Sequence, residues 1–216
     1  NREFKRDDAD GYIITGMRGS DYAWIETLAK PVVLFGENSN GYDFVDVNNK
    51  LGTSMATQAA INQGFTNIVF IGIEVKEPFE FSREAGYVNT LQSARQIPQV
   101  HRLRNHSHIS EQFVTEHWDD FPTNTAFICA SDRLALGVVR ALGRCGGLIP
   151  EDYGVVGFDG VFLDQVSNPQ LSTVKSPVAH LGQLVAQMLL NKIQQDGAPQ
   201  GELLVTPELV LRRTMR

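Results

Sequence analysis

The sequence is poor in cysteine, in long apolar runs and in positive charge. Its two cysteines, Cys129 and Cys145, fall in an apolar stretch and near the end of an expected helix, which is typical of reduced thiols rather than of a disulfide. No apolar run approaches the roughly 20 residues of a membrane-spanning helix, and the chain does not open with a signal peptide. Acidic residues outnumber basic ones by 25 to 19, which argues against a chain whose main partner is a phosphate backbone.

The motifs of common enzyme classes are also missing. The sequence has no G-x-S-x-G elbow, no P-loop and no G-x-G-x-x-G after a strand, and the segment 157–160 (GFDG) is not a phosphate cradle. Four histidines raise the question of a metal site, but their spacing matches no standard ligand set and no cysteine joins them: His101, His106, His108 and His117. We therefore expect a binding protein with no metal and no cofactor, rather than an enzyme.

The length of 216 residues, 42% of them hydrophobic, allows one large domain or two small ones with an ample core. The chain opens on the charged segment NREFKRDDADG and has no initiating methionine. We therefore expect that residues upstream of Asn1 are missing from the sequence.

The segment 126–160 contains a complete strand–helix–strand unit. Residues 126–130 form an apolar run of strand length, Ser131 can cap a helix, and Asp132 lies in its first turn, where the helix dipole favours a carboxylate. Two glycines at 146–147 end the helix, and residues 155–158 form the second strand. This order predicts a parallel pair of strands joined by a right-handed crossover.

The rest of the chain repeats the alternation of strands and helices, which predicts an α/β fold with mostly parallel sheets. The remaining strands are expected at 11–15, 32–35, 44–47, 67–72, 100–103 and 171–174, with two short ones within 202–213. The remaining helices are expected at 20–29, 51–64, 82–95, 109–118 and 178–195, with a short helical turn at 161–166.

Polar side chains follow three of these strands, at the edge where an open parallel sheet binds ligands. Arg83 follows the strand at 67–72, preceded by the aromatic Phe79 and Phe81, and Asp159 follows the strand at 155–158. Ser131, Asp132 and Arg133 follow the strand at 126–130. Carboxylates accept hydroxyl hydrogen bonds, arginine donates in pairs and aromatic rings stack on apolar faces, a mixture that suits a small polyhydroxylated ligand.

Each of these side chains also has a structural explanation. If Ser82 caps the helix, Arg83 lies in the first turn, where a cation opposes the dipole, so either a ligand or a carboxylate such as Asp159 must compensate, or the arginine is merely solvated. Asp159 can cap the turn at 161–166, and the dipole alone explains Asp132. One of the two phenylalanines can be simple loop packing.

Several motifs resemble those of the LacI/GalR family of transcriptional regulators, from about residue 10 to the end. They are DADGYIITG, PVVLFG, VNNKLGTSMATQAAINQGFTNIVFIG, SREAGY, the segment 126–160, NPQLSTVKSPVAHLG and LVLRRT. The sequence departs from the common family pattern at Asn48-Asn49, where the family has Asp-Asn, and at Phe65, where it has His.

The resemblance implies two similar Rossmann-like lobes of the type I periplasmic-binding-protein fold, with the first lobe incomplete at its N-terminus. The N-terminal lobe would comprise residues 1–66 and 176–203, and the C-terminal lobe 67–175 and 204–216. The family's effector, usually a sugar or nucleoside, would lie in the cleft between the lobes. The resemblance places these residues at effector contacts: Arg83, Asp159, Ser131, Arg133, Phe79, His106 and Asn48.

The resemblance also implies partners. The native protein would be a cytoplasmic homodimer that binds operator DNA through an N-terminal helix-turn-helix absent from this chain, and its effector would change operator affinity; no membrane partner is expected. Two alternatives share the fold: a periplasmic sugar-binding protein of a transport or chemosensing system, and an enzyme acting on a sugar or nucleoside. A signal peptide upstream would favour the first and turnover the second, although no activated nucleophile is visible.

Overall fold

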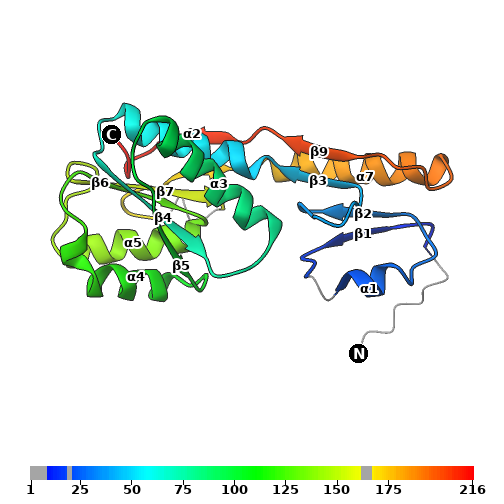
Figure 1. The fold of residues 1–216 in the computed structure, drawn as a ribbon, viewed down its shortest axis with the longest axis horizontal. Coiled ribbons are helices and arrows are strands. Elements are labelled where there is room, and N and C mark those ends of the chain that lie inside the picture. The colour runs from blue at the N-terminus through cyan, green and yellow to red at the C-terminus, as the bar shows by residue number, and fades with distance from the viewer. Residues whose placement is uncertain (1–8, 19–20, 162–166) are drawn as a thin grey trace. The chain divides into compact units, whose positions relative to one another are not determined.

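The computed structural model of the chain describes residues 9–18, 21–161 and 167–216 (Figure 1). It divides into two compact units, which we call unit 1 (Asn1–Val47 with Pro177–Val205) and unit 2 (Asn48–Ser176 with Thr206–Arg216). The lobes predicted from the sequence differ from these units mainly in residues 48–66, predicted in the N-terminal lobe. Helix α2 (Asn49–Asn62) belongs to unit 2 because it packs against helix α3 (Pro78–Ser93) and against five strands of that unit.

Unit 1 is built on a parallel sheet of four strands in the order β1-β2-β3-β9. The strands are β1 (Tyr12–Thr15), β2 (Val32–Phe35), β3 (Phe44–Val47) and β9 (Glu202–Val205). Helix α7 (Val178–Gln194), predicted from its apolar spacing, packs against β1, β2 and β3. The helix expected at 20–29 is shorter than predicted: α1 (Tyr22–Ile25) is a single turn that packs Ile25 against the core around Leu34.

A buried ion pair joins α7 to the sheet of unit 1. Lys192 Nζ lies 2.5 Å from Asp43 Oδ2 and donates to the carbonyl oxygen of Val32 at 3.1 Å. The other oxygen, Asp43 Oδ1, accepts the backbone N–H groups of Gln200 and Gly201, which lead into β9. The Asp43 carboxylate therefore fixes α7 and the start of β9 beside β3.

Unit 2 contains a sheet of six strands in the order β10-β8-β7-β6-β4-β5, with β10 antiparallel to β8 and every other neighbouring pair parallel. The strands are β4 (Asn67–Ile73), β5 (Gln99–Leu103), β6 (Thr125–Cys129), β7 (Tyr153–Asp159), β8 (Ser172–Lys175) and β10 (Glu208–Val210). The predicted strand–helix–strand unit is confirmed as β6, α5 (Asp132–Arg144) and β7. Phe127, Val155 and Phe158 are completely buried, so this unit forms the centre of the core.

Two pairs of helices cover the sheet of unit 2. Figure 1 shows α2 and α3 on one face, and α4 (Ser107–Glu116) and α5 on the other. Gly86 allows α2 and α3 to come close, because a Cβ there would lie 2.2 Å from the carbonyl oxygen of Lys50. The hydroxyl of Thr53 on α2 donates to the carbonyl oxygen of Arg83 at 2.6 Å, so this contact also positions the first half of α3.

Some boundaries differ from the sequence expectation. Helix α3 begins at Pro78 instead of Ser82, since proline at the first helical position loses no intrahelical hydrogen bond and has a suitable fixed φ. Helix α4 begins at Ser107 rather than at residue 109. The short turn expected at 161–166 lies outside the described residues except for Val161.

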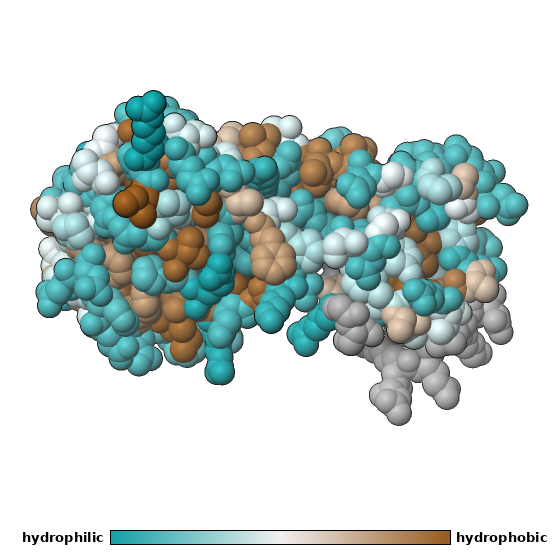
Figure 2. Space-filling model, viewed as in Figure 1, coloured by the Kyte–Doolittle hydropathy of each residue, from teal (hydrophilic) through white to brown (hydrophobic). Residues whose placement is uncertain are grey.

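Figure 2 shows hydrophobic residues interspersed with hydrophilic ones on the visible face. The exposed large apolar side chains come from separate elements and loops, among them Trp24, Ile97, Leu148 and Val178. Within the described parts of the chain, no helix is both long and apolar enough to cross a membrane.

Candidate functional site

The carboxyl ends of β4, β6 and β7 meet at one edge of the unit 2 sheet. β4 leads into α3, which carries Arg83; β6 leads into Ala130 and Ser131; and β7 ends at Asp159. Parallel neighbours end at the same edge, which explains why residues far apart in the sequence converge there. The structure brings Arg83 and Asp159 into contact, as their positions after separate strands predicted.

The argument from a first-turn arginine was wrong. Because α3 begins at Pro78, Arg83 lies in the second turn, where the helix dipole opposes a cation less, and Glu80 occupies the first turn. Arg83 is nevertheless not a solvated surface residue, since its side chain is only 9% exposed. Burial of a guanidinium requires partners, and the structure supplies them.

Three parts of unit 2 accept hydrogen bonds from Arg83. Its Nε donates to Asn49 Oδ1 at 2.8 Å, its Nη1 to the carbonyl oxygen of Ala130 at 2.5 Å, and its Nη2 to Asp159 Oδ1 at 3.2 Å. A guanidinium has five N–H groups, so N–H groups at both Nη atoms are still without a described protein acceptor. Arg83 is held in place by the protein and keeps donors for a ligand.

Aromatic rings complete the surroundings of Arg83. The guanidinium carbon lies 3.7 Å from the centroid of the buried Phe158 ring and 5.2 Å from that of Phe79. Cation–π contacts of this kind stabilise a guanidinium electrostatically. Phe79 is half-buried at the start of α3, whereas Phe81 is 55% exposed and lies two residues further along the helix. Of the two phenylalanines, Phe79 is therefore the one beside the site.

Asp159 combines a binding geometry with an unusual backbone. Its side chain is 41% exposed although Oδ1 accepts from Arg83, so part of the carboxylate faces solvent. Its φ is 107°, in the region that favours glycine, and its carbonyl oxygen accepts the N–H of Ser176 at 3.2 Å. Strained residues of this type are held by surrounding contacts and concentrate at functional sites. The alternative role, capping the turn at 161–166, involves residues outside the described part.

Ser131 performs the predicted cap and also connects two loops. Its Oγ accepts the N–H of Leu134 at 3.2 Å at the start of α5, and it donates to Asn105 Oδ1 at 2.7 Å. The exposed Arg133 makes a long contact of 3.4 Å from Nη1 to the carbonyl oxygen of Asn105. Asn105, which the sequence analysis missed, therefore joins the β5–α4 loop to the start of α5.

The structure places Asp132 in the protein interior, where both of its oxygens are engaged. Oδ1 accepts the hydroxyl of Thr173 at 2.6 Å, and Oδ2 accepts the N–H of Val161 at 2.9 Å. Gly157 makes room for it, because a Cβ there would lie 2.3 Å from Oδ1. Asp132 thus supports the segment directly after Asp159.

Asn48 and Asn49 have different positions. Asn48 Oδ1 caps α2 by accepting the N–H of Leu51 at 2.9 Å. Asn49, which is completely buried, is the one that contacts Arg83. The sequence analysis selected the first and missed the second, because no local pattern separates two adjacent asparagines just before the expected helix.

The remaining predicted residue, His106, is exposed at the start of α4, with its ring tilted against that of His108 at 5.5 Å between centroids. His101 and His117 pack instead against the ring of Phe113. Burial lowers the pKa of His101, with a further contribution from His117. Among the residues that the structure describes, no group of three or more histidines, cysteines or carboxylates could hold a metal ion.

The comparisons with known proteins agree with this architecture. The family model of the periplasmic-binding-protein-like domain matches residues 57–215. The chain is 46% identical over 206 residues to the HTH-type transcriptional regulator YvdE of Bacillus subtilis, described as uncharacterized, covering 95% of this chain and 65% of that protein. The chain belongs to the periplasmic-binding-protein-like domain family.

Two further proteins illustrate the relationship. The ribose operon repressor of Haemophilus influenzae is 31% identical over 172 residues, covering 78% of this chain and 52% of that protein. A LacI family transcriptional regulator from Enterococcus faecium, solved with bound ribose, superposes with a TM-score of 0.83 at 22% identity, covering 96% of this chain and 80% of that one, which shows the fold. The chain spans about half to two thirds of the length of these curated relatives, which are named as a transcriptional regulator and an operon repressor.

Proposed function

We propose that this chain is the effector-binding and dimerisation core of a bacterial DNA-binding transcriptional regulator that senses a small sugar-like metabolite. The effector contacts the edge of unit 2 where Arg83, Asp159 and Phe79 lie. Ser131, Arg133 and His106 lie in neighbouring loops and contribute further polar contacts. Asn48 and Asp132 act by holding α2 and the segment after Asp159, because their described side-chain oxygens already accept protein hydrogen bonds.

The pairing of Arg83 with Asp159 carries this proposal. A buried guanidinium with spare donors, next to a carboxylate that is 41% exposed, can donate to one sugar hydroxyl and accept from its neighbour. The ring of Phe79 can pack against the apolar face of a pyranose or furanose. No charged ligand is needed to balance the site, since Arg83 and Asp159 neutralise each other.

The names of the relatives support the sugar class and the regulatory role. One is a ribose operon repressor, and one structure of the same fold contains ribose. By analogy, operator DNA is bound by a helix-turn-helix segment outside this chain, the native protein is a cytoplasmic homodimer, and the effector alters operator affinity. Such an effect requires that the effector binds one conformational state more tightly than another.

Binding of D-ribose, D-cellobiose and a panel of other mono- and disaccharides tests the proposal, first by thermal shift and then by calorimetry. A ligand that binds only the folded state raises the melting temperature. Arg83→Ala and Asp159→Asn should each weaken the affinity of the sugar found by about tenfold or more, since hydrogen bonds to charged groups contribute about 1.5–3 kcal/mol.

Arg95→Ala and Asp119→Asn serve as matched controls, because both residues are exposed and distant in sequence from the strand ends that form the site. Both controls should bind like the wild type. Unchanged affinity in Arg83→Ala and Asp159→Asn would contradict the site, and failure of the full-length protein to bind any DNA from its own promoter would contradict the regulatory role.

A further inference from the structure

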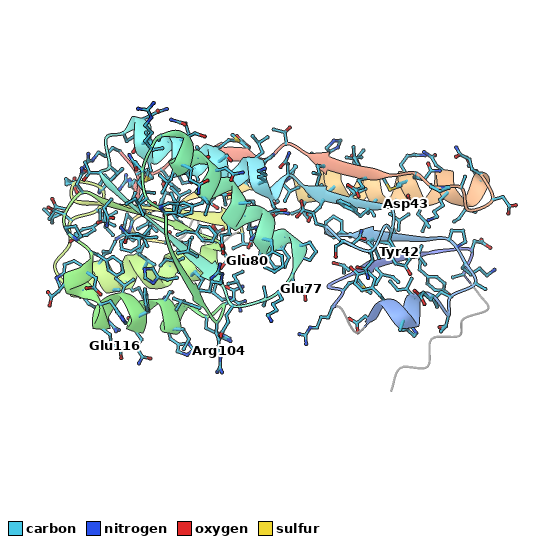
Figure 3. All side chains as sticks on the ribbon, viewed as in Figure 1. Tyr42, Asp43, Glu77, Glu80, Arg104 and Glu116 are labelled. Carbon is cyan, nitrogen blue, oxygen red and sulfur yellow. The ribbon has the colours of Figure 1, made fainter. Side chains whose placement is uncertain are left out.

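Glu80 lies three residues before Arg83 on α3 and is almost completely buried, with 1% of its surface exposed. It occupies the first turn of α3, and Figure 3 labels it there together with Glu77 at the helix start. Its Oε1 accepts the N–H of Ile73, the last residue of β4, at 2.7 Å. Gly72 leaves the space for this contact, because a Cβ there would lie 2.6 Å from Oε1. Glu80 therefore ties the end of β4 to the helix that carries Arg83.

The second oxygen of this carboxyl, Oε2, is buried and has no hydrogen-bond partner among the described residues. The charged groups around Glu80 are Arg83 and Glu84 on α3 and Arg102 on β5. Arg102 is engaged by Glu84 through two hydrogen bonds, and the donors of Arg83 point to Asn49, Ala130 and Asp159. No described cation forms an ion pair with Glu80.

An ionised carboxylate in this position would be poorly solvated. It would have one backbone donor, whereas a carboxylate in water accepts several hydrogen bonds, and a buried charge without a partner is costly. The neutral acid needs less compensation, and burial accordingly raises the pKa of Glu80 to about 7, against the lowering influence of the Ile73 N–H and of Arg83.

We propose that Glu80 is a positioning residue of the effector site, and that Arg83 keeps its binding geometry while Glu80 Oε2 carries a proton. This inference rests on the proposed function, because it concerns the same arginine. Loss of that proton places a negative charge three residues before Arg83 on the same helix, where it attracts the guanidinium away from Asn49, the Ala130 carbonyl and Asp159. Effector affinity is then linked to pH near neutrality.

Nuclear magnetic resonance of the ligand-free protein tests this directly. The Arg83 Nε–H signal reports the hydrogen bond to Asn49, and it should shift between about pH 5.5 and 8.5 with a midpoint near the Glu80 pKa. Glu80→Gln keeps an oxygen for the Ile73 N–H but cannot ionise, so the shift should disappear. Glu77→Gln removes a carboxylate at the start of the same helix and should leave the shift as in the wild type.

An Arg83 signal that does not move with pH in the wild type, or that still moves in Glu80→Gln, would overturn the inference. If Glu80→Gln does not fold, the side-chain carboxyl carbon of Glu80 in the wild-type protein decides instead: a titration midpoint below about 5, near the ordinary value, would overturn it. These measurements need no ligand, so failure of every sugar to bind would count against the proposed function and not against the Glu80 linkage.

Discussion

Arg83 contacts two consecutive residues of β7: its Nη2 lies 3.2 Å from Asp159 Oδ1, and its guanidinium carbon lies 3.7 Å from the ring centroid of Phe158. Arg83 and Asp159 are 76 positions apart in the sequence. Their exposures differ, at 9% for the arginine side chain and 41% for the aspartate. The arginine is thus the buried and fixed member of the pair, and the aspartate is the more exposed one.

Because of the backbone conformation at Asp159, two substitutions that lose the same affinity should differ in stability. Its φ of 107° is unfavourable for any residue with a Cβ, and residues in sparsely populated regions cost of order 1–3 kcal/mol. Asp159→Gly and Asp159→Ala both remove the carboxylate, so they should lose sugar affinity equally. We expect Asp159→Gly to be the more stable by about 1–2 kcal/mol in denaturant unfolding, because glycine adopts this φ freely. Equal stability of the two variants would show that the backbone relaxes when the carboxylate is lost.

Asp132 should matter for stability more than its position beside the site suggests. Asp132→Asn replaces one acceptor by an NH2 group. If the NH2 faces the Val161 N–H, two donors meet; if it faces Thr173 Oγ1, the hydroxyl must accept instead and loses the acceptor of its own proton. A buried donor left without an acceptor costs about 1–3 kcal/mol. Urea unfolding should detect this loss, and Asp119→Asn, an exposed aspartate, should change stability by less than about 0.5 kcal/mol.

Replacing two glycines of α5 by alanine should change the stability of the protein in opposite directions. At Gly137 a Cβ would lie 2.0 Å from the carbonyl oxygen of Ser107 on α4, so Gly137→Ala must push the helices apart. At Gly143 a Cβ would meet no atom within 4 Å, so Gly143→Ala should stabilise the helix by about 0.5–1 kcal/mol. Thermal unfolding should therefore give a lower melting temperature for the first variant and a higher one for the second. A neutral Gly137→Ala would contradict the close packing of α4 on α5.

The ion pair of Asp43 with Lys192 should make unit 1 sensitive to acid. Burial alone would raise the pKa of Asp43, but Lys192 and the N–H groups of Gln200 and Gly201 outweigh it and hold the pKa below 3.8. A lowered folded-state pKa means that the stabilisation is complete above the unfolded-state value and is lost as the pH falls through the folded-state value. Unfolding followed from about pH 6 to 2 should show this loss in the wild type and not in Asp43→Asn. Asp196→Asn, at an exposed position of unit 1, should retain the wild-type profile.

The sequence was sufficient for the elements whose signals are local. Ser131 caps α5 as predicted, the glycine pair at 146–147 follows its end, and Gly146 has a positive φ of 81°. The apolar runs of β4, β6 and β7 are buried strands, and the spacing of apolar residues in α7 predicted the helix that covers unit 1. These features depend on neighbours within one turn or one strand, so a linear pattern contains them.

The start of α3 was misjudged because the prediction used local signals alone. Ser82 offered a plausible cap, but Pro78 also suits the first turn, and the local signals do not rank the two. The contact of Glu80 with Ile73 favours the earlier start, and that contact exists only once β4 and α3 are packed together.

The sequence by itself determined the α/β class, the strand ends and the residue types available at them, because hydrophobic periodicity and turn residues act over short distances. Tertiary structure decided which of those residues meet. The parallel order of β4, β6 and β7 brings Arg83 to Asp159, and the packing of α2 on α3 adds Asn49, which no local pattern distinguishes from its neighbour Asn48. Tertiary structure also decided that Asp132 is enclosed by the protein while Asp159 is partly exposed, since burial depends on every element packed around a side chain.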